Sequence, residues 1–186
     1  MKKEVNTLEP EDSLLLIIDL QEKFKPVIEK WDEIVSNTAK LIYTFRILDL
    51  PIIITEQYPE GLGSSVAEIK NALGDEYKPI KKVEFDALSN PRIMLKVEEK
   101  DRKNLVITGI EAHVCILQTS LSALQRGYRV HLPWDAISAR KESDIELAMR
   151  RLEQAGALTA STEMIIFQLL KSSKNPKFKE VQSVVK

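Results

Sequence analysis

Residues 14–20 read LLLIIDL, an apolar run that a single carboxylate, Asp19, interrupts. A strand with one wet face alternates apolar and polar residues, whereas a continuous apolar run is typical of a strand buried on both faces. Strands of that kind form parallel sheets that helices cover on both sides. The run therefore predicts an α/β fold in which Asp19 comes at the end of a buried strand.

Strand-like and helix-like segments alternate along the rest of the chain. Short apolar runs predict further strands at residues 52–55, 78–83, 105–107, 128–132 and 158–161. Near-helical spacing of apolar residues predicts helices at residues 31–50, 90–100, 116–126, 142–154, 162–170 and 175–186. Residues 56–65, EQYPEGLGSS, contain one Pro and two Gly and are expected to form a loop. This order predicts one domain over residues 1–186, a Rossmann-like three-layer α/β/α sandwich with a six-stranded parallel sheet.

The composition excludes several classes of protein. A formal net charge of −1 over 186 residues provides no electrostatic field for binding nucleic acid or an anionic membrane. No apolar run approaches the roughly 18 residues that a membrane-spanning helix needs. One cysteine allows no intramolecular disulfide, and the N-terminal MKKEVNTLEPED lacks the apolar core of a secretory signal. We therefore expect a cytoplasmic protein that binds neither nucleic acid nor membranes.

The single cysteine, Cys115, lies where the strand at residues 105–107 gives way to the next helix. A thiol in the first turn of a helix is close to unpaired N–H groups and a partial positive charge, and both favour the thiolate. A lone cysteine is otherwise an ordinary small buried hydrophobe. Its position favours a functional role, because α/β proteins bind ligands at strand-to-helix turns on the carboxyl edge of the sheet.

Three chemically useful side chains are predicted to share that edge: Asp19, Lys82 and Cys115, which follow or end three different strands. Cys115 would attack an electrophilic carbon, and Asp19 would take the thiol proton and later activate water. Lys82 would orient Asp19 and add positive charge near the thiolate. Asp19 by itself is equally consistent with a residue that caps the next turn.

Longer motifs resemble a known family. LLIIDLQEKF, KKVEF and GIEAHVCILQTSLSALQRGYRVHLPWDAIS are similar to segments of the isochorismatase-like hydrolases, also called the cysteine hydrolase superfamily. TEQYPEGLG and STEMIIFQLL further resemble the isochorismatase domain-containing subgroup. The resemblance covers residues 13–179, which is nearly the whole chain.

The resemblance implies a catalytic triad of Asp19, Lys82 and Cys115. Lys82 is preferred to its neighbour because it matches the family's K-x-x-F spacing to Phe85. The resemblance also implies a cis peptide bond between Ile110 and Glu111. The N–H groups of Glu111 and Cys115 would then form an oxyanion hole. Homo-oligomers are expected on the same ground.

Two departures from better-known branches bear on the cofactor and the pocket. The nicotinamidase branch binds a metal through Asp-x-His after the second strand, whereas TEQYPEG contains no histidine. We therefore expect no metal and no cofactor. A carboxylate, Asp86, stands where the family has a small hydroxyl residue, and it would alter the charge of the pocket. Candidate substrate-pocket residues are Gln21, Phe24, Tyr58, Phe85 and His113, the last of which is alternatively a hydrogen-bonding residue at the helix entry.

The function expected from these residues is metal-independent hydrolysis of a small amide or related carbonyl compound through a thioester on Cys115. One alternative is isochorismate-type vinyl ether hydrolysis, in which Asp19 protonates the substrate and no cysteine adduct forms. That branch lacks the nucleophile, so Cys115 argues against it. A second alternative is a non-catalytic, oligomeric interaction module with the same fold, which would need none of the three side chains.

Overall fold

The computed structural model describes residues 7–186, which form a six-stranded, all-parallel sheet in the order β3-β2-β1-β4-β5-β6. The strands are β1 (Ser13–Ile18), β2 (Ile52–Gln57), β3 (Ile80–Lys82), β4 (Asn104–Gly109), β5 (Arg129–Pro133) and β6 (Leu158–Ala160). The predicted α/β fold with six parallel strands is therefore confirmed. No helix within residues 7–186 combines the length and the apolar character needed to cross a membrane.

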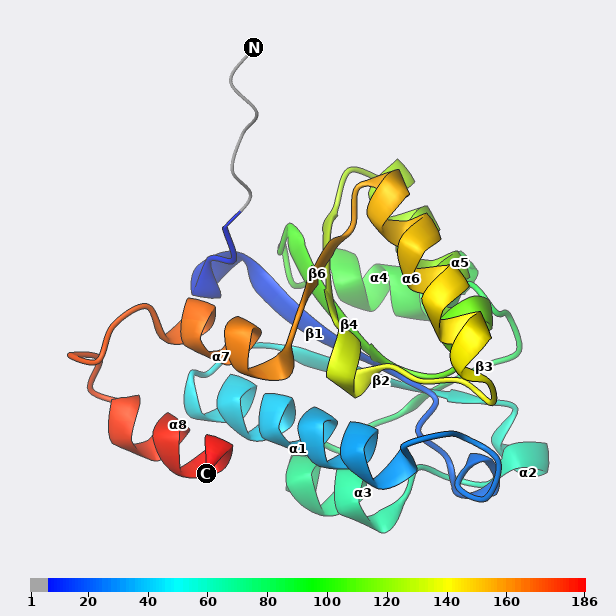
Figure 1. The fold of residues 1–186 in the computed structure, drawn as a ribbon, viewed down its shortest axis with the longest axis horizontal. Coiled ribbons are helices and arrows are strands. Elements are labelled where there is room, and N and C mark those ends of the chain that lie inside the picture. Colours follow the sequence, from blue (N-terminus) through cyan, green and yellow to red (C-terminus); the bar gives the residue numbers. More distant parts are fainter. Residues whose placement is uncertain (1–6) are drawn as a thin grey trace.

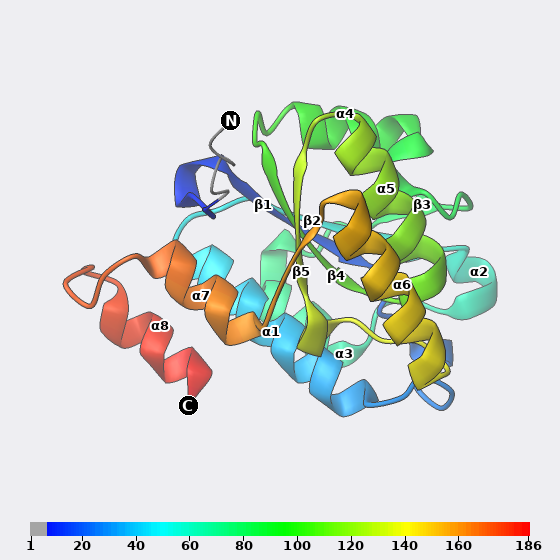
Figure 2. The same cartoon turned by 45° about the horizontal axis from the view of Figure 1, so that its top comes forward.

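Helices cover both faces of the sheet (Figures 1 and 2). The helices are α1 (Trp31–Ile47), α2 (Pro59–Leu62), α3 (Ala67–Leu73), α4 (Pro91–Glu98), α5 (Leu117–Gln125), α6 (Glu142–Ala155), α7 (Thr162–Leu170) and α8 (Phe178–Val185). One layer consists of α1, α3, α7 and α8, and the other of α4, α5 and α6. The short helix α2 lies at the end of β2, at the periphery of the molecule.

The central strand β1 explains why its sequence is continuously apolar. Leu15 and Ile17 pack into the cluster that includes α1, α3 and α7. Leu14, Leu16 and Ile18 face the opposite way and pack into the cluster that includes α4, α5 and α6. Alternate side chains of a strand point to opposite faces, so residues 14–18 all lie in an apolar core when helices cover both faces.

Gly109 allows β4 to lie close against the end of β1. Its φ of +117° is unfavourable for any residue with a side chain, and a Cβ there would lie 2.0 Å from the carbonyl oxygen of Ile18. Ile18 pairs with both Thr55 and Gly109, so β1, β2 and β4 are in register near their carboxyl ends. The residues that follow these strands therefore emerge together at one edge of the sheet.

The structure differs from the sequence prediction at several elements. The segment 56–65 is not a continuous loop, because β2 extends to Gln57 and α2 follows it. The helix α3 was not predicted; it has seven residues, and Val66 before it provides no capping side chain. The helix α1 ends at Ile47 rather than at residue 50, because Asp49 adopts a left-handed φ of 56° and the next residue precedes a proline.

We expect stability to fall in mild acid because of His131, which is buried in β5. Burial, with a smaller effect of Arg129, lowers the pKa of His131 to about 4. Between about pH 6.5 and 4, this histidine is protonated more fully in the unfolded chain than in the folded protein. The free energy of unfolding is therefore at its full value above about pH 6.5 and falls as the pH drops below it. Urea unfolding should show a loss of about 2 kcal/mol between pH 7.5 and 5 that His131→Leu abolishes. An equally steep loss in His131→Leu would assign the effect to other groups.

Candidate active site

Asp19 directly follows β1, and its carboxylate points into the protein. Its backbone is left-handed, with φ 57°, a conformation that Asp tolerates better than most residues. The side chain is buried, at 1% exposure, and both of its oxygens accept hydrogen bonds. Thr55 Oγ1 donates to Oδ1 at 2.8 Å, and Lys82 Nζ donates to Oδ2 at 2.6 Å. Each oxygen of the Asp19 carboxylate therefore has its own hydrogen-bond donor, and the donor at Oδ2 is the charged partner of an ion pair.

Lys82 is the last residue of β3 and joins the other two candidate groups. Its ammonium donates to Asp19 Oδ2 and, at 2.6 Å, to Gln57 Oε1. The carbonyl oxygen of Glu84 is a third acceptor at 3.2 Å, and Cys115 Sγ lies 3.6 Å away. A buried charge is tolerated only with such partners. The neighbouring Lys81 points to the surface, where it pairs with Glu60 at 2.8 Å.

Cys115 lies in a π-helical turn, Ala112–Ile116, that leads directly into α5. Its side chain is 6% exposed. The turn is anchored at its start, because the N–H of Ala112 donates to the carbonyl oxygen of Ser138 at 2.8 Å. The peptide bond between Ile110 and Glu111, just before this turn, is cis. The three candidate side chains thus meet at the carboxyl edge of β1, β3 and β4.

The protonation state of Cys115 differs from the sequence expectation. Burial, reinforced by the negative charge of Asp19, raises the pKa of the Cys115 thiol to about 12, and the opposing effect of Lys82 is smaller. The expectation that the helix start provides a thiolate at neutral pH is therefore wrong. The resting site contains a neutral thiol beside an Asp–Lys ion pair, so the thiol must lose its proton as it reacts.

Thr55 and Gln57, two residues of β2 that contact the ion pair, were not among the site residues predicted from the sequence. Gln57 is fixed in turn, since its Nε2 donates to the carbonyl oxygen of Val83 at 2.8 Å. The available signal was their spacing, because residues i and i+2 of a strand share a face. Interpreting residues 56–65 as a loop hid that signal.

Two further buried side chains hold the segment after β2 in place. Gln21, a predicted pocket residue, is fully buried, and its side-chain amide bonds to backbone groups of Gln57 and Gly63. Glu56 accepts hydrogen bonds from the N–H and hydroxyl of Ser65 and from the hydroxyl of Tyr77. Burial and the bond to Glu56 raise the pKa of Tyr77 to about 12. These contacts fix the position of the segment that carries α2.

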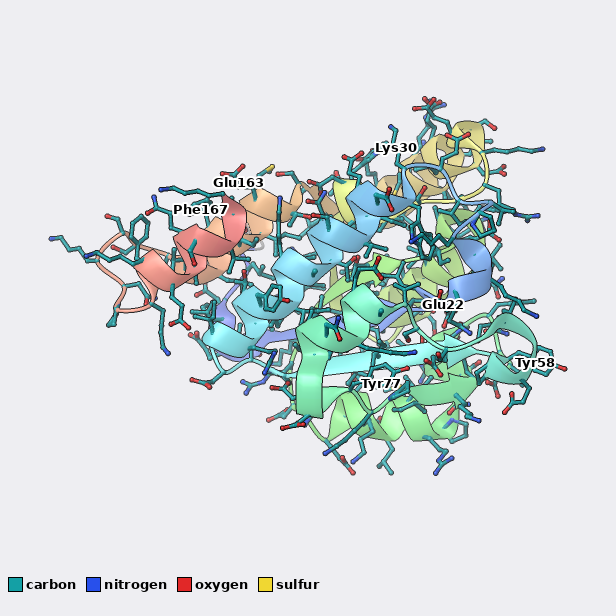
Figure 3. All side chains as sticks on the ribbon, turned by 90° about the horizontal axis from the view of Figure 1, so that it is seen from below. Glu22, Lys30, Tyr58, Tyr77, Glu163 and Phe167 are labelled. Carbon is teal, nitrogen blue, oxygen red and sulfur yellow. The ribbon has the colours of Figure 1, made fainter. Side chains whose placement is uncertain are left out.

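The remaining predicted pocket residues do not form one cluster. Tyr58 is 54% exposed at the outer end of β2 (Figure 3), and Phe85 is 53% exposed. Phe24 packs against the apolar cluster on the α1 side of the sheet. His113 Nε2 lies 3.8 Å from Asp144, and its buried Nδ1 has no hydrogen-bond partner within residues 7–186.

Asp86, the carboxylate four residues after Lys82, caps a short turn: its Oδ1 accepts from the N–H of Leu88 at 2.9 Å. The residues from 7 onward contain no group of three or more His, Cys, Asp or Glu side chains placed to hold a metal ion.

A family model described as the isochorismatase domain matches residues 13–164, which is most of the chain. The chain belongs to the isochorismatase family. Isochorismatase domain-containing protein 2A of Mus musculus is 40% identical over 178 residues, which are 95% of this chain and 84% of the mouse protein. The predicted family and subgroup are therefore confirmed.

Solved structures of isochorismatase-fold proteins superpose closely on this chain. The structure of a Caenorhabditis elegans protein described as MAR1 ribonuclease has a TM-score of 0.91 and 41% sequence identity, covering 97% of this chain and 92% of that one. The Escherichia coli YcaC gene product, described as an octameric hydrolase of unknown specificity, has a TM-score of 0.88 over 99% of this chain and 98% of its own. At 23% identity, YcaC supports the fold alone.

We expect the two charged neighbours of Cys115 to affect its reactivity in opposite directions. Asp19→Asn removes a charge that raises the thiol pKa, so it should speed alkylation by iodoacetamide at pH 8 by about 10-fold or more. Lys82→Ala removes a charge that lowers the pKa and should slow the reaction. Rates are measured by mass spectrometry of the intact protein.

The reference for both variants is the wild-type protein, native and in denaturant. The native thiol should react at least about 100-fold more slowly than the unfolded one at pH 8, because far less of it is thiolate. Equal rates for native and unfolded protein would mean that Cys115 is neither buried nor held protonated.

Proposed function

We propose that this chain is a cysteine hydrolase that cleaves a small amide or related carbonyl compound through a thioester on Cys115. The observation that carries the proposal is the position of Lys82 Nζ, 2.6 Å from Asp19 Oδ2 and 3.6 Å from Cys115 Sγ. A base, a cation and a nucleophile are thus held in one buried cluster. The coarser assignment, an isochorismatase-family fold typical of hydrolases, follows from the family membership.

Acylation begins with a neutral thiol, because the pKa of Cys115 is raised to about 12. Asp19 takes the thiol proton while Sγ forms a bond to the carbonyl carbon, so that no free thiolate accumulates. Asp19 then gives this proton to the leaving nitrogen as the C–N bond breaks. Ammonia or an amine departs, and the acyl group remains on Sγ.

Deacylation uses the same groups in the reverse sense. Asp19 accepts a proton from water as the water oxygen attacks the thioester carbon. The C–S bond then breaks, and the proton returns from Asp19 to the sulfur of Cys115. Throughout, Lys82 holds the carboxylate in place through its hydrogen bond to Oδ2.

The N–H groups of Glu111 and Cys115 are the proposed oxyanion hole. Two contacts support a fixed position for this segment: Arg140 Nε donates to Glu111 Oε2 at 2.9 Å, and the next residue, Ala112, is anchored by Ser138. Donors that are fixed before the reaction stabilise a developing oxyanion without a reorganisation cost.

The two alternatives considered from the sequence are less well supported. Vinyl ether hydrolysis requires a carboxylic acid that donates a proton, whereas both oxygens of Asp19 accept hydrogen bonds, from Thr55 and Lys82. A purely structural module gains little from a buried ion pair, because desolvation offsets much of its attraction.

Ribonuclease activity is named for the C. elegans relative, but no feature of this chain favours it independently. The formal net charge of −1 provides no general attraction for RNA. Single-stranded RNA therefore belongs in the substrate screen described below, and we expect no Cys115-dependent cleavage of it.

We also propose that the chain forms a homo-oligomer, as the family resemblance implies; YcaC, which shares the fold, is described as octameric. Sedimentation at micromolar concentration should give a mass well above the 21.2 kDa of one chain. A mass of one chain at all concentrations would contradict this proposal and leave the catalytic assignment untouched.

Asp19→Asn should reduce turnover by about 100-fold or more, because the amide cannot accept the thiol proton. The assay is a screen of small amides monitored by released ammonia, with Cys115→Ala as the blank. Near-wild-type turnover by Asp19→Asn on an amide that requires Cys115 would remove Asp19 from the mechanism. Absence of any Cys115-dependent substrate would count against the hydrolase proposal itself.

Activity should be independent of metal ions. Dialysis against a chelator should leave turnover unchanged, and elemental analysis should find no stoichiometric zinc, iron or manganese. About one tightly bound transition metal per chain, lost together with activity, would contradict the proposal and favour a metal-dependent site.

A further inference from the structure

The strand β2 presents two polar side chains to the buried ion pair. Thr55 and Gln57 are separated by one residue and therefore share a face of the strand. Thr55 pairs in register with Ile18, next to Asp19, while Gln57 pairs in register with Lys82. The sheet thus places each of these residues beside one member of the ion pair.

Each contact joins one side chain of β2 to one member of the pair. Thr55 Oγ1 lies 2.8 Å from Asp19 Oδ1 and 3.5 Å from the carbonyl oxygen of Ile17, so the carboxylate is the better placed acceptor for its single proton. Gln57 Oε1 lies 2.6 Å from Lys82 Nζ. These bonds leave Asp19 Oδ2 and Lys82 Nζ facing each other.

Gln57 has no freedom to turn away from Lys82. Its Nε2 is bound to the carbonyl oxygen of Val83, which fixes the amide so that oxygen, not nitrogen, faces the ammonium. Its backbone N–H and carbonyl oxygen are both bound by the buried amide of Gln21. The three oxygens around the ammonium, from Asp19, Gln57 and Glu84, can take its three N–H donors. Cys115 Sγ is then a fourth neighbour that meets its positive charge.

We propose that Thr55 and Gln57 are positioning residues that hold the carboxylate of Asp19 and the ammonium of Lys82 in the geometry needed for proton transfer from Cys115. This inference rests on the proposed function of the Asp–Lys–Cys cluster. Neither residue touches the sulfur or provides a group that reacts. Each acts through its hydrogen bond to one charged partner.

The Thr55 arm of the test uses turnover on an amide substrate. Thr55→Val keeps the shape but removes the donor to Asp19, and kcat should fall about 10-fold or more, with KM changed less than about 2-fold. Thr55→Ser keeps the hydroxyl and should recover most of the loss. The matched control is Thr44→Val in α1, a buried threonine whose hydroxyl has no hydrogen-bond partner within residues 7–186; it should leave kcat unchanged.

The Gln57 arm needs no substrate. Gln57→Glu keeps an oxygen against Lys82 but adds a negative charge, which disfavours the Cys115 thiolate. Alkylation of Cys115 by iodoacetamide at pH 9 should therefore slow by about 10-fold. A merely structural role predicts the opposite, because a loosened site exposes the thiol and speeds alkylation.

The two arms separate failure of this inference from failure of the proposed function. If wild-type protein hydrolyses no amide, the proposed hydrolase function is contradicted. The alkylation rate of Gln57→Glu still tests whether Gln57 influences the charge around Lys82 and Cys115. Faster or unchanged alkylation in a Gln57→Glu variant that retains wild-type circular dichroism would overturn the inference. An equal loss of kcat in Thr44→Val and Thr55→Val would do the same. If Gln57→Glu fails to fold, Gln57→Met replaces it, with an expected loss of kcat at constant KM.

Discussion

The ion pair between Asp19 and Lys82 is the interaction on which the arrangement of the candidate site depends. Both side chains are almost fully buried, and their 2.6 Å contact joins residues that are 63 positions apart in the chain. Removing either partner would leave an uncompensated charge in the core, which is far more costly than losing a surface ion pair. The polar groups nearby, from β2 and the turn after β3, satisfy the remaining hydrogen bonds of this pair.

Pairing of the strands in the sheet determines how closely the three side chains of the cluster approach one another. Lys82 and Cys115 are 33 positions apart and come from opposite sides of β1, yet their polar atoms lie 3.6 Å apart. Parallel pairing brings the ends of β1, β2 and β4 to one edge, and the close approach of Gly109 to Ile18 permits that register. The buried polar side chains after β2 then fix the backbone beside the site. The local chemistry therefore depends on packing of the whole domain core.

The sequence predicted the features that repeat along the chain. Continuous apolar runs such as LLLII gave the parallel sheet, and strand ends located Asp19, Lys82 and Cys115 near one another. Prediction from the sequence failed for properties that depend on contacts between residues far apart in the chain. The raised pKa of Cys115 comes from burial and from the negative charge of Asp19, which together outweigh the opposing effect of Lys82. Gln57 was missed because the Pro and Gly after it suggested a loop, whereas pairing with β3 extends the strand.

The protonated state of Cys115 also has a consequence for oxidative chemistry. Peroxide reacts with thiolates, and thiols that stay protonated are oxidised to sulfenic acid slowly. A nucleophile that is deprotonated only as it attacks its substrate is exposed to oxidants for a small part of each catalytic cycle. Redox-sensing cysteines have the opposite properties, with a low pKa and an accessible sulfur. The same burial that delays ionisation of Cys115 would thus preserve the nucleophile through periods of oxidative stress.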